Sequence, residues 1–570
     1  MDTHAPLTDS SPLPALSNAE IADRLASLAQ LLSTQKENPY KVKAYRRAAA
    51  SIRNLSESID ELVREEADLT RFEGIGETIS SAVREIVLTG SLGKLEKLRS
   101  EASPALASIS AYPRLDPKQV VRIYKKLNIS SVEELREQLE SGAIEKALSQ
   151  RMAQHVRQGL TETQGMLLYR ADDLRDAVEE YLVAKCGVRR AEVAGAYRRR
   201  AEVTEDLEYI IETDDFPGVV AMLQRYGGRT PLVSSSKDTA LFTLSSGIQL
   251  RIRLASPKDW GLSLIECTGS KAHLRKLAAV TGSLKSLRTK GPFPTEEAFY
   301  GKFGLAFIEP ELREGYDEVK RAADGTLPVL VTVKDIRGEL HAHSTSSDGS
   351  HSIEQMASAA KEKGYEYLGI TDHSQSLKIA RGVSVENLWK QIRYIDKLNE
   401  RLKGFQVLKS SEVDILVDGS LDYPEDLLKE LDYTVCSIHS RFGLGKAEQT
   451  ERIMRAMDNR YFNILGHATG RLLLKRPGYE IDIERIIGHA RKNGCFFEIN
   501  ASPDRLDLSA ENARSAHEAG IKIAVSTDAH SMREFDNVIY GLNQARRAGL
   551  DKNCVLNCLP WDKLSRLFRR

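Results

Sequence analysis

The last third of the sequence constrains the fold most, because short apolar runs alternate there with amphipathic helical segments up to its end. Such alternation is typical of parallel strands joined by helices. The apolar runs repeatedly end in residues that bind metals: His341 and His343, Asp372 and His373, Glu412 and Asp414, His439, His467, Glu498 and Asn500, and Asp528 and His530. Since the carboxyl ends of all strands in a parallel barrel open on one face, we expect these side chains to converge there.

The histidines in particular favour a metal site. Alternate residues of an extended strand point to the same face, so His341 and His343 can approach one point. A single histidine at a strand end is more often a structural residue, but six of the 12 histidines end these runs. The remaining six, including His351, His489 and His517, are interpreted as surface or structural residues.

The candidate ligands are numerous enough for two or three ions if one carboxylate bridges. They are His341, His343, Asp348, His373, Glu412, His439, His467, Asp528 and His530. Imidazoles combined with carboxylates favour zinc, manganese or iron over magnesium, which prefers oxygen ligands. Metals ~3.5–4 Å apart can ionise a water and stabilise the oxygens of a phosphoryl group. The chemistry predicted from these residues is therefore the hydrolysis of a phosphoester.

Composition bounds the rest of the chain. At ~150 residues per domain, 570 residues predict three to four domains. Lysine plus arginine equals aspartate plus glutamate, at 81 each, so bulk charge argues neither for nor against a nucleic-acid partner. No apolar run reaches the ~20 residues that span a bilayer, and the first residues lack a signal-peptide pattern. We therefore expect a cytoplasmic protein, with nucleoid association as an option, no membrane partner, and 6 reduced cysteines.

The organisation changes twice along the chain, from helical segments to mixed strands and helices, and then to the regular alternation. We therefore expect a multi-domain fold that is all-α, then α+β, then an α/β barrel. The expected parts are a disordered tail (1–17), a small helical domain (18–100), a second helical domain (101–167), an α+β region (168–325), a linker (326–335) and a metal-binding barrel domain (336–570). In the α+β region, the segment "AEVAGAY" at 191–197 is among the predicted strands.

A candidate DNA-binding element lies in the first helical domain. The stretch "FEGIGETISSAV", residues 72–83, has Gly74 and Gly76 before a helix, the arrangement of a helix-hairpin-helix. Backbone N–H groups at such glycines can face a DNA phosphate without reading sequence, although an ordinary glycine turn has the same pattern. A nearby basic run supplies candidate phosphate contacts, or is simply a solvated face. Its cationic residues are Lys41, Lys43, Arg46 and Arg47.

Residues 336 to 550 resemble a PHP domain, of the polymerase and histidinol phosphatase superfamily. The resemblance rests on the motifs "HAH", "SDG", "TDH", "SEVDI", "SIHSRF", "GHATGR" and "STDAH". It implies a distorted seven-stranded α/β barrel that holds three metals. The implied ligand sets are His341, His343, Glu412 and Asp528, then Glu412, His439 and His467, and finally Asp348, His373 and His530. Arg441 and Arg471 follow ligand strands and are candidates to bind a phosphate, with plain surface salt bridges as the alternative.

The region before the barrel resembles family X DNA polymerases. From about residue 18 to 570 the layout resembles the bacterial family X polymerase with a PHP domain fused behind it. The family's turn before the metal-binding strand reads "AGAYRRR" here. It keeps Gly195, Arg198 and Arg199 but has Ala196 in place of a serine that would touch the incoming triphosphate.

The carboxylates of the polymerase metal site depart from that pattern. The usual Asp-x-Asp pair reads "EDLEY", which gives Asp206 and Glu208. In "GIQLRIRLA", Arg251 stands where the family's third aspartate belongs. Two unit charges ~4 Å apart interact by about 4 kcal/mol at an effective dielectric near 20, so an arginine beside a dication is a large penalty. We therefore expect a broken two-metal transfer site and doubtful Mg²⁺ binding.

Two further departures agree with an impaired polymerase. Glu266 and Cys267 replace the aromatic pair that the family sets before "TGSK", so a platform beside the incoming sugar is missing. Arg114 and Asp116 replace the glycines of a second hairpin motif, and Asp116 would repel a phosphate.

The leading interpretation is a metal-dependent 3'-5' exonuclease or 3'-end processing enzyme that acts on gapped or nicked DNA without sequence preference. Its cofactor is expected to be Zn²⁺ or Mn²⁺, and its polymerase-derived part is expected to bind DNA. The first alternative is an active gap-filling polymerase in which Glu205 or Asp214 replaces the lost ligand. The remaining alternatives are a DNA-binding scaffold and a small-molecule phosphatase of the histidinol-phosphatase type.

Overall fold

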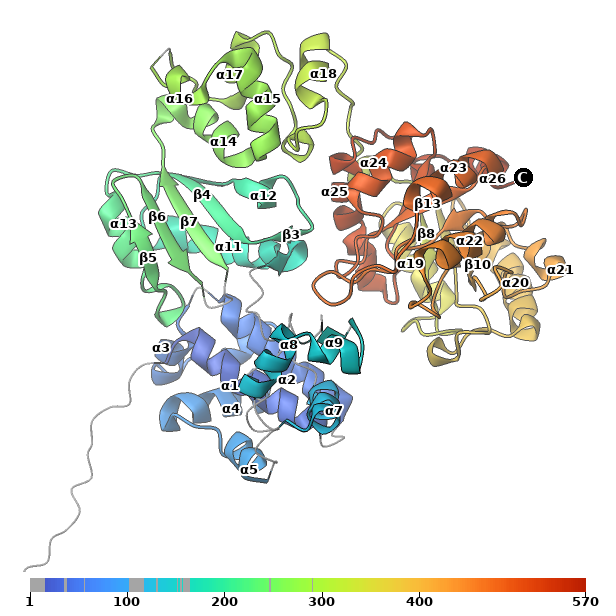
Figure 1. Ribbon diagram of the computed structural model, residues 1–570, viewed down its shortest axis with the longest axis horizontal. Helices are drawn as coiled ribbons and strands as arrows, with labels where there is room; N and C mark the ends of the chain where they lie inside the picture. Colours follow the sequence, from blue (N-terminus) through green and yellow to red (C-terminus); the bar gives the residue numbers. More distant parts are fainter. Residues whose placement is uncertain are drawn as a thin grey trace, which may run out of the picture. The chain divides into compact units, whose positions relative to one another are not determined.

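A computed structural model gives the architecture in Figure 1. It describes residues 16–34, 38–55, 57–101, 117–129, 132–150, 152–153, 156, 165–244, 248–289 and 291–569. The chain forms two compact units, of which the first spans 1–166, 170–194 and 205–257, and the second spans 167–169, 195–204 and 258–570. The segment 1–15 of the expected tail, together with Arg114 and Asp116, lies outside the described residues. No helix among the described residues is long and apolar enough to cross a membrane.

The first unit begins with helices that share one apolar core. They are α1 (Asn18–Thr34), α2 (Pro39–Asn54), α3 (Ile59–Arg64), α4 (Glu77–Thr89) and α5 (Gly93–Glu101). Ser17 caps α1: its Oγ accepts from the Glu20 N–H at 3.3 Å, and its own N–H donates to the Glu20 carboxylate at 2.8 Å. A separate small core joins α7 (Pro117–Leu127), α8 (Val132–Glu140) and α9 (Ala143–Ala147).

A five-stranded sheet completes the first unit, in the order β2-β4-β7-β6-β5. Its strands are β2 (Arg190–Val193), β4 (Asp206–Glu212), β5 (Leu232–Ser235), β6 (Thr239–Thr243) and β7 (Gln249–Leu254). The central strands β4 and β7 run parallel, whereas the other neighbours pair antiparallel. Helix α11 (Leu168–Ala184) precedes β2, and α13 (Phe216–Leu223) follows β4.

The predicted strand at 191–197 is wrong in its second half. Strand β2 ends at Val193, and the chain then turns through Gly195, at φ +69°, into the short helix α12 (Gly195–Arg198). The left-handed conformation, which glycine adopts without a Cβ clash, ends the extended run. The apolar alternation of the sequence continues through this turn, which is why pattern alone extended the strand.

The second unit contains a small helical part before the barrel. Its helices are α14 (Trp260–Thr268), α15 (Lys271–Thr281), α16 (Leu284–Leu287), α17 (Glu296–Lys302) and α18 (Glu318–Asp324). They enclose an aromatic core that includes Phe293, Phe299 and Tyr300. A Cβ at Gly261 would lie 2.0 Å from the Thr295 carbonyl carbon, so only glycine allows α14 to approach the start of α17 this closely.

The last part is a parallel barrel of seven strands whose sheet order, β14 back to β8, follows the chain. The strands are β8 (Gly338–Ala342), β9 (Tyr367–Ile370), β10 (Gln406–Asp414), β11 (Tyr433–Ser437), β12 (Ile464–Leu465), β13 (Phe496–Asn500) and β14 (Ile523–Ser526). Just beyond β14, the Ala529 carbonyl accepts from the His343 N–H at 2.8 Å, which nearly closes the barrel against β8. The expected seven-stranded α/β barrel is confirmed.

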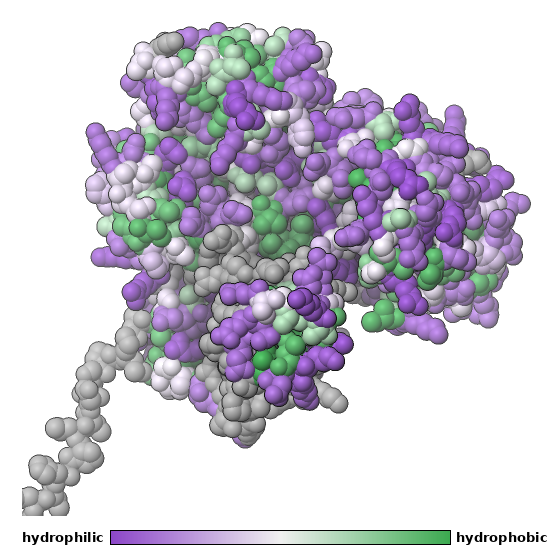
Figure 2. Space-filling view, viewed as in Figure 1, coloured by the Kyte–Doolittle hydropathy of each residue, from purple (hydrophilic) through white to green (hydrophobic). Residues whose placement is uncertain are grey.

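Amphipathic helices surround these strands (Figure 1). They are α19 (Ile353–Glu362), α20 (Val385–Asn399), α21 (Glu425–Leu428), α22 (Lys446–Met457), α23 (Ile483–Asn493), α24 (Ala510–Glu518) and α25 (Val538–Arg547). Their apolar faces join the large core around the barrel, and the surface that they present in Figure 2 is mostly hydrophilic.

Helix α26 (Trp561–Phe568) covers the end of the barrel where the strands begin. Its Leu564 and Phe568 join a second core inside the strands, and Asn463, immediately before β12, donates to the Phe568 carbonyl at 2.8 Å. The amino end of the barrel is therefore filled with apolar side chains. The carboxyl end remains for the polar residues.

Candidate metal centre and polymerase-like site

The carboxyl end of the barrel brings together all nine predicted ligands. His341 on β8 and His343 directly after it are both completely buried. The Nε2 atom of His341 lies 3.5 Å from a Glu412 oxygen and 3.4 Å from an Asp528 oxygen. The Nε2 atom of His343 lies 3.0 Å from the same Asp528 oxygen. Ligands from β8, β10 and the end of β14 thus face one point.

Glu412 is the centre of a second group. Its carboxylate, 1% exposed, faces imidazoles that follow three other strands. The His373 Nδ1 atom lies 2.8 Å from Oε2, and the Nε2 atoms of His439 and His467 lie 3.3 and 2.9 Å from Oε1. One carboxylate with imidazoles at both oxygens can bridge two cations.

Asp348 is the centre of a third group. The Nε2 atoms of His530 and His373 lie 3.3 and 3.6 Å from its carboxylate, and the Nδ1 atom of His343 lies at 3.8 Å. His343 and His373 therefore each face two groups, one through each ring nitrogen. The ligand sets implied by the family resemblance gave each of these histidines to a single ion.

Carboxylates and carbonyls behind the histidines fix the orientation of their rings. The Nδ1 atom of His341 lies 2.6 Å from Glu498 Oε1, and that of His439 lies 2.6 Å from Asp414 Oδ1. The Nδ1 atom of His530 lies 2.8 Å from the Asp528 carbonyl oxygen. Such contacts fix the tautomer that presents a lone pair to a metal. Asp414 and Glu498 were noted from sequence as strand-end residues, but this supporting arrangement was not predicted.

Asp372, another residue at a strand end, stabilises a loop and does not join the cluster. It accepts hydrogen bonds from the Ser344 N–H at 2.8 Å, the Ser347 hydroxyl at 2.6 Å and the Gln391 amide at 3.1 Å. The loop that it holds carries His343 and Asp348 at its two ends.

The donor set fits a bound cation. Among the described residues, His341 Nε2, His343 Nδ1 and Glu412 Oε2 face the cluster as buried polar atoms with no hydrogen-bond partner. Leaving buried polar atoms unsatisfied is costly, and a metal ion would satisfy such atoms. Nitrogen and carboxylate oxygen together suit transition-metal ions. The nine residues can therefore hold metal.

The charge balance of the cluster gives the same conclusion. Burial alone would lower the pKa of His373, but the adjacent Glu412 and Asp348 carboxylates raise it to about 10. Burial would likewise lower the pKa of His439, but the Glu412 and Asp414 carboxylates raise it to about 9. The carboxylates therefore attract positive charge strongly, which protons supply in the metal-free chain.

The two arginines proposed to bind phosphate have different surroundings. Arg471 donates to the Glu202 carboxylate at 2.6 Å and to the Arg505 carbonyl at 3.1 Å, so the salt-bridge alternative describes it. Arg441 is exposed, with φ +58°, and no ion pair to it occurs among the described residues. Arg505 was missed: its Nε lies 3.9 Å from Asp528 Oδ2. It follows β13 in "NASPDRLDLS", so its position after a strand that ends in the polar residues Glu498 and Asn500 was the available signal.

The turn that resembles the polymerase triphosphate-binding turn is held by carboxylates of the second unit. Arg198 forms two contacts to Glu296, at 2.9 and 2.7 Å, and donates to the Thr268 hydroxyl at 3.1 Å. Arg199 lies 3.1 Å from a Glu314 oxygen and donates to the Thr268 carbonyl at 2.7 Å. Ala196 offers no hydroxyl at this turn.

In the sheet of the first unit, the polymerase-like carboxylates face arginines. The parallel register sets Glu208 beside Arg251, as the sequence pattern predicted. Arg251 Nε lies 3.9 Å from Asp206 Oδ2, and Arg253 Nη2 lies 3.3 Å from Glu208 Oε1. The cationic side chains thus occupy the space beside the two carboxylates. This arrangement leaves the sheet with two carboxylates and two guanidinium groups on adjacent strands.

The replacement carboxylates considered from sequence are not equivalent. Asp214 lies eight residues beyond Asp206, which is ~26 Å along an extended strand, and it pairs with Arg189. It is therefore too distant to complete a site at Asp206. Glu205 precedes Asp206 directly, is exposed, and points to the other side of an extended chain.

The glycine turn of the candidate hairpin is packed against the basic helix. Gly74 has φ +83°, and a Cβ there would lie 3.1 Å from Arg47 Cγ. Gly76 is the residue before α4, where no side chain caps the free N–H groups. Lys43, Arg46 and Arg47 are exposed on α2, whereas Lys41 is half-buried. Free N–H groups at a helix start beside cations suit a phosphate.

Comparison with known proteins matches both ends of the chain. Residues 16–92 match a helix-hairpin-helix domain, and residues 339–502 match a PHP domain. A Bacillus subtilis protein named DNA polymerase/3'-5' exonuclease PolX is 33% identical over 576 residues, 97% of this chain and 99% of its own. A probable phosphatase of a Thermoanaerobacter species is 33% identical over 231 residues, 38% of this chain and 89% of its own. One of Acetivibrio thermocellus is 29% identical over 212 residues, 35% of this chain and 83% of its own.

Proposed function

The chain belongs to the bacterial PolX family of DNA polymerases with a PHP domain, and from this membership we propose that it is a metal-dependent 3'-5' exonuclease. The observation that carries the proposal is the cluster of six imidazoles and three carboxylates at the carboxyl end of the barrel. Such a cluster suits several cations and the hydrolysis of a phosphodiester. Its expected cofactors are two or three ions of Zn²⁺ or Mn²⁺.

The residues of the chain divide the work of hydrolysis. The nine ligands would hold the cations, which would activate water and stabilise phosphoryl charge. Glu498 and Asp414 keep His341 and His439 in the orientation that ligation needs. Arg441, exposed after β11, and Arg505, near Asp528, neutralise the phosphate of the bound strand.

The polymerase-like part binds DNA and is impaired in nucleotidyl transfer. Its metal site has Arg251 and Arg253 beside Asp206 and Glu208, where a two-metal site needs carboxylates alone. The helix-hairpin-helix domain supports binding of gapped or nicked DNA through phosphates, with no reading of sequence. An active gap-filling polymerase remains the competing hypothesis because the relative's name includes DNA polymerase.

A phosphatase that acts on small molecules is the second candidate, favoured by the probable phosphatases that match the barrel. Those relatives match no more than 38% of this chain, and the helix-hairpin-helix domain lies outside that share. A DNA substrate accounts for both parts of the chain.

One experiment separates these functions. The purified chain is incubated with end-labelled gapped DNA and Mn²⁺, with and without nucleotides, beside its His341→Ala and Asp206→Ala variants. We expect shortening of the 3' end that His341→Ala abolishes and Asp206→Ala preserves. Nucleotide-dependent lengthening that Asp206→Ala abolishes would contradict the impaired polymerase. Hydrolysis of a histidinol-phosphate-like monoester without any cleavage of DNA would contradict the nuclease.

A further inference from the structure

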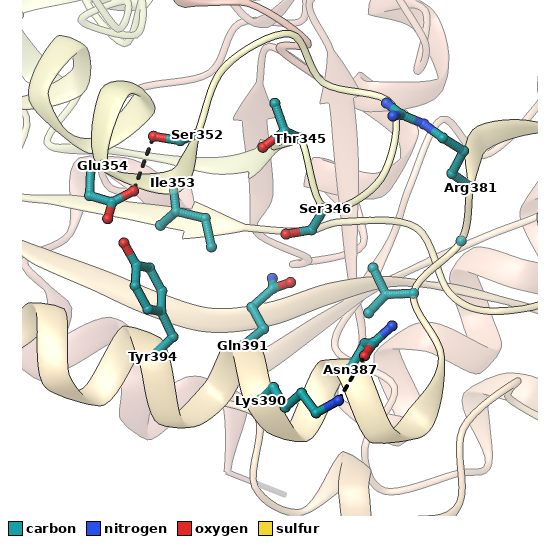
Figure 3. Close-up of a pocket in the computed structure, with 12 residues that line it drawn as sticks. Thr345, Ser346, Ser352, Ile353, Glu354, Arg381, Asn387, Lys390, Gln391 and Tyr394 are labelled. Carbon is teal, nitrogen blue, oxygen red and sulfur yellow. Dashed lines mark hydrogen bonds between the residues drawn. The ribbon is translucent and has the colours of Figure 1, made fainter.

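A pocket of about 540 Å³ lies beside the metal centre, between α19, α20 and the segment 381–383 (Figure 3). Its lining includes Thr345 and Ser346, which lie two and three residues after the ligand His343. On the opposite side, the Val383 N–H donates to the carbonyl of the ligand His373 at 2.8 Å. The walls of the pocket are therefore continuous with two strands that carry ligands. Its volume is within the ~300–1,000 Å³ of small-molecule sites.

The two ends of the pocket differ in charge. Figure 3 shows Arg381 at one end, and Glu354 and Tyr394 at the other. Arg381 is exposed, and no carboxylate pairs with its guanidinium within the described ranges. Glu354 accepts from the Ser352 hydroxyl at 3.0 Å, so its carboxylate is held at the far end. An anionic group is favoured at the Arg381 end, and an uncharged ring at the Tyr394 end.

The side-chain amide of Gln391 lies between these ends, and its oxygen has no hydrogen-bond partner among the described residues. Gln391 is 7% exposed and lies between the ends in Figure 3. Its Nε2 donates to Asp372 at 3.1 Å, but its Oε1 is buried without a donor among the residues that the structure describes. A buried acceptor with no donor is destabilising, and a donor on a bound molecule would satisfy it.

We propose that this pocket binds the 3'-terminal nucleotide of the strand whose last phosphodiester lies at the metal centre. Its phosphate lies toward Arg381, and its base lies against the Tyr394 ring, where stacking tolerates any base. A donor of the nucleotide satisfies Gln391 Oε1. The proposal rests on the proposed nuclease function and adds the position of the leaving nucleotide. Water attacks the phosphorus, the bond to the preceding 3' oxygen breaks, that oxygen takes a proton, and the terminal residue leaves as a 5'-mononucleotide.

The test uses the full chain with Mn²⁺ and the variants Arg381→Gln and Tyr394→Ala. The matched control is Arg393→Gln. It also removes one arginine charge, but from an exposed position on α20 that does not line the pocket. Calorimetry measures the binding of a deoxynucleoside 5'-monophosphate and of deoxyribose 5-phosphate, which lacks the base. Kinetics with a 3'-labelled single strand give KM and kcat.

We expect Arg381→Gln to weaken binding of both probes and to raise the KM for DNA by about tenfold, as loss of one charge-assisted contact implies. Tyr394→Ala should weaken the mononucleotide only, and Arg393→Gln should change neither. Equal effects of Arg381→Gln and Arg393→Gln, or no mononucleotide binding by a chain that degrades DNA, would overturn the pocket assignment. Mononucleotide binding by a chain that never cleaves DNA would instead overturn the nuclease, and with it the role of the pocket as the site of a leaving nucleotide.

Discussion

The barrel and the five-stranded sheet both place carboxylates near cationic side chains, and the kind of cation distinguishes them. In the barrel, Glu412 faces imidazoles from several strands; in the sheet, Asp206 and Glu208 face guanidinium groups of β7. An imidazole can lose its proton and offer a lone pair to a metal, whereas a guanidinium keeps its protons and has no acceptor. Carboxylates beside histidine thus remain available to a metal, and carboxylates beside arginine are already neutralised.

The largest effect that this comparison predicts is at the shared carboxylate of the barrel. Glu412→Gln keeps the shape but removes the charge that faces His373, His439 and His467. We expect loss of bound metal and a fall in exonuclease rate of at least ~10³-fold. Metal analysis of the purified variant and end-shortening assays measure both. Retained metal with full activity would show that Glu412 is not a ligand.

The sheet offers the reverse experiment. Arg251→Asp replaces the cation beside Asp206 with a carboxylate, which should allow Mg²⁺ to bind. We expect primer extension on gapped DNA to rise by about a hundredfold over the unaltered chain. Arg251→Gln is the control, because it removes the charge without adding a ligand and should give a smaller rise. If the unaltered chain already extends primers efficiently and Arg251→Asp lowers the rate, the proposed difference between the two sites would be wrong.

A smaller effect on metal binding is expected from a residue that orients a ligand and is not itself a ligand. Glu498→Gln leaves His341 in place but weakens the contact that orients its ring. Metal affinity should fall by ~10–100-fold, with the fold unchanged. Titration with Mn²⁺, monitored by activity and by calorimetry, measures the shift. An unchanged affinity would mean that the strands alone orient the ring.

The smallest effect concerns a histidine outside the metal centre. His273 is buried, with its Nδ1 2.7 Å from Glu318. Burial lowers the pKa of His273 below 6.5. The Glu318 carboxylate opposes this shift, whereas Arg313 and Arg199 add to it. The unfolded chain therefore binds this proton more readily, so the contribution to stability is lost as the pH falls below that value. Thermal unfolding at about pH 5.5 and about pH 7.5 should show a smaller difference in Tm for His273→Gln than for the unaltered chain.

Sequence reasoning predicted the barrel well because its signal is repeated at every strand. Six histidines at the ends of apolar runs can converge in only one way if the strands are parallel. The charge reversal at Arg251 was also visible, because a period of two fixes which residues share a face. Both inferences needed only the local pattern and one topology.

Contacts between segments that are distant in the sequence were harder to predict. No spacing connects Arg471 with Glu202, which is 269 residues away, so its ion pair could not be distinguished from a phosphate contact. The double role of His343 and His373 depends on ring rotation, which the sequence does not encode at short range. The β2 strand was extended too far because a glycine turn interrupted a run whose apolar pattern continued.

The near closure of the barrel has a consequence for its synthesis. His341 lies on the first strand and His343 directly after it, whereas Asp528 and His530 follow the last strand, which meets the first through Ala529 and through the Thr527 contacts to Glu339. A growing chain on the ribosome therefore carries the early imidazoles for almost 190 residues before their partners emerge. The metal centre therefore stays incomplete until the residues that follow the last strand, Asp528 and His530, have been made.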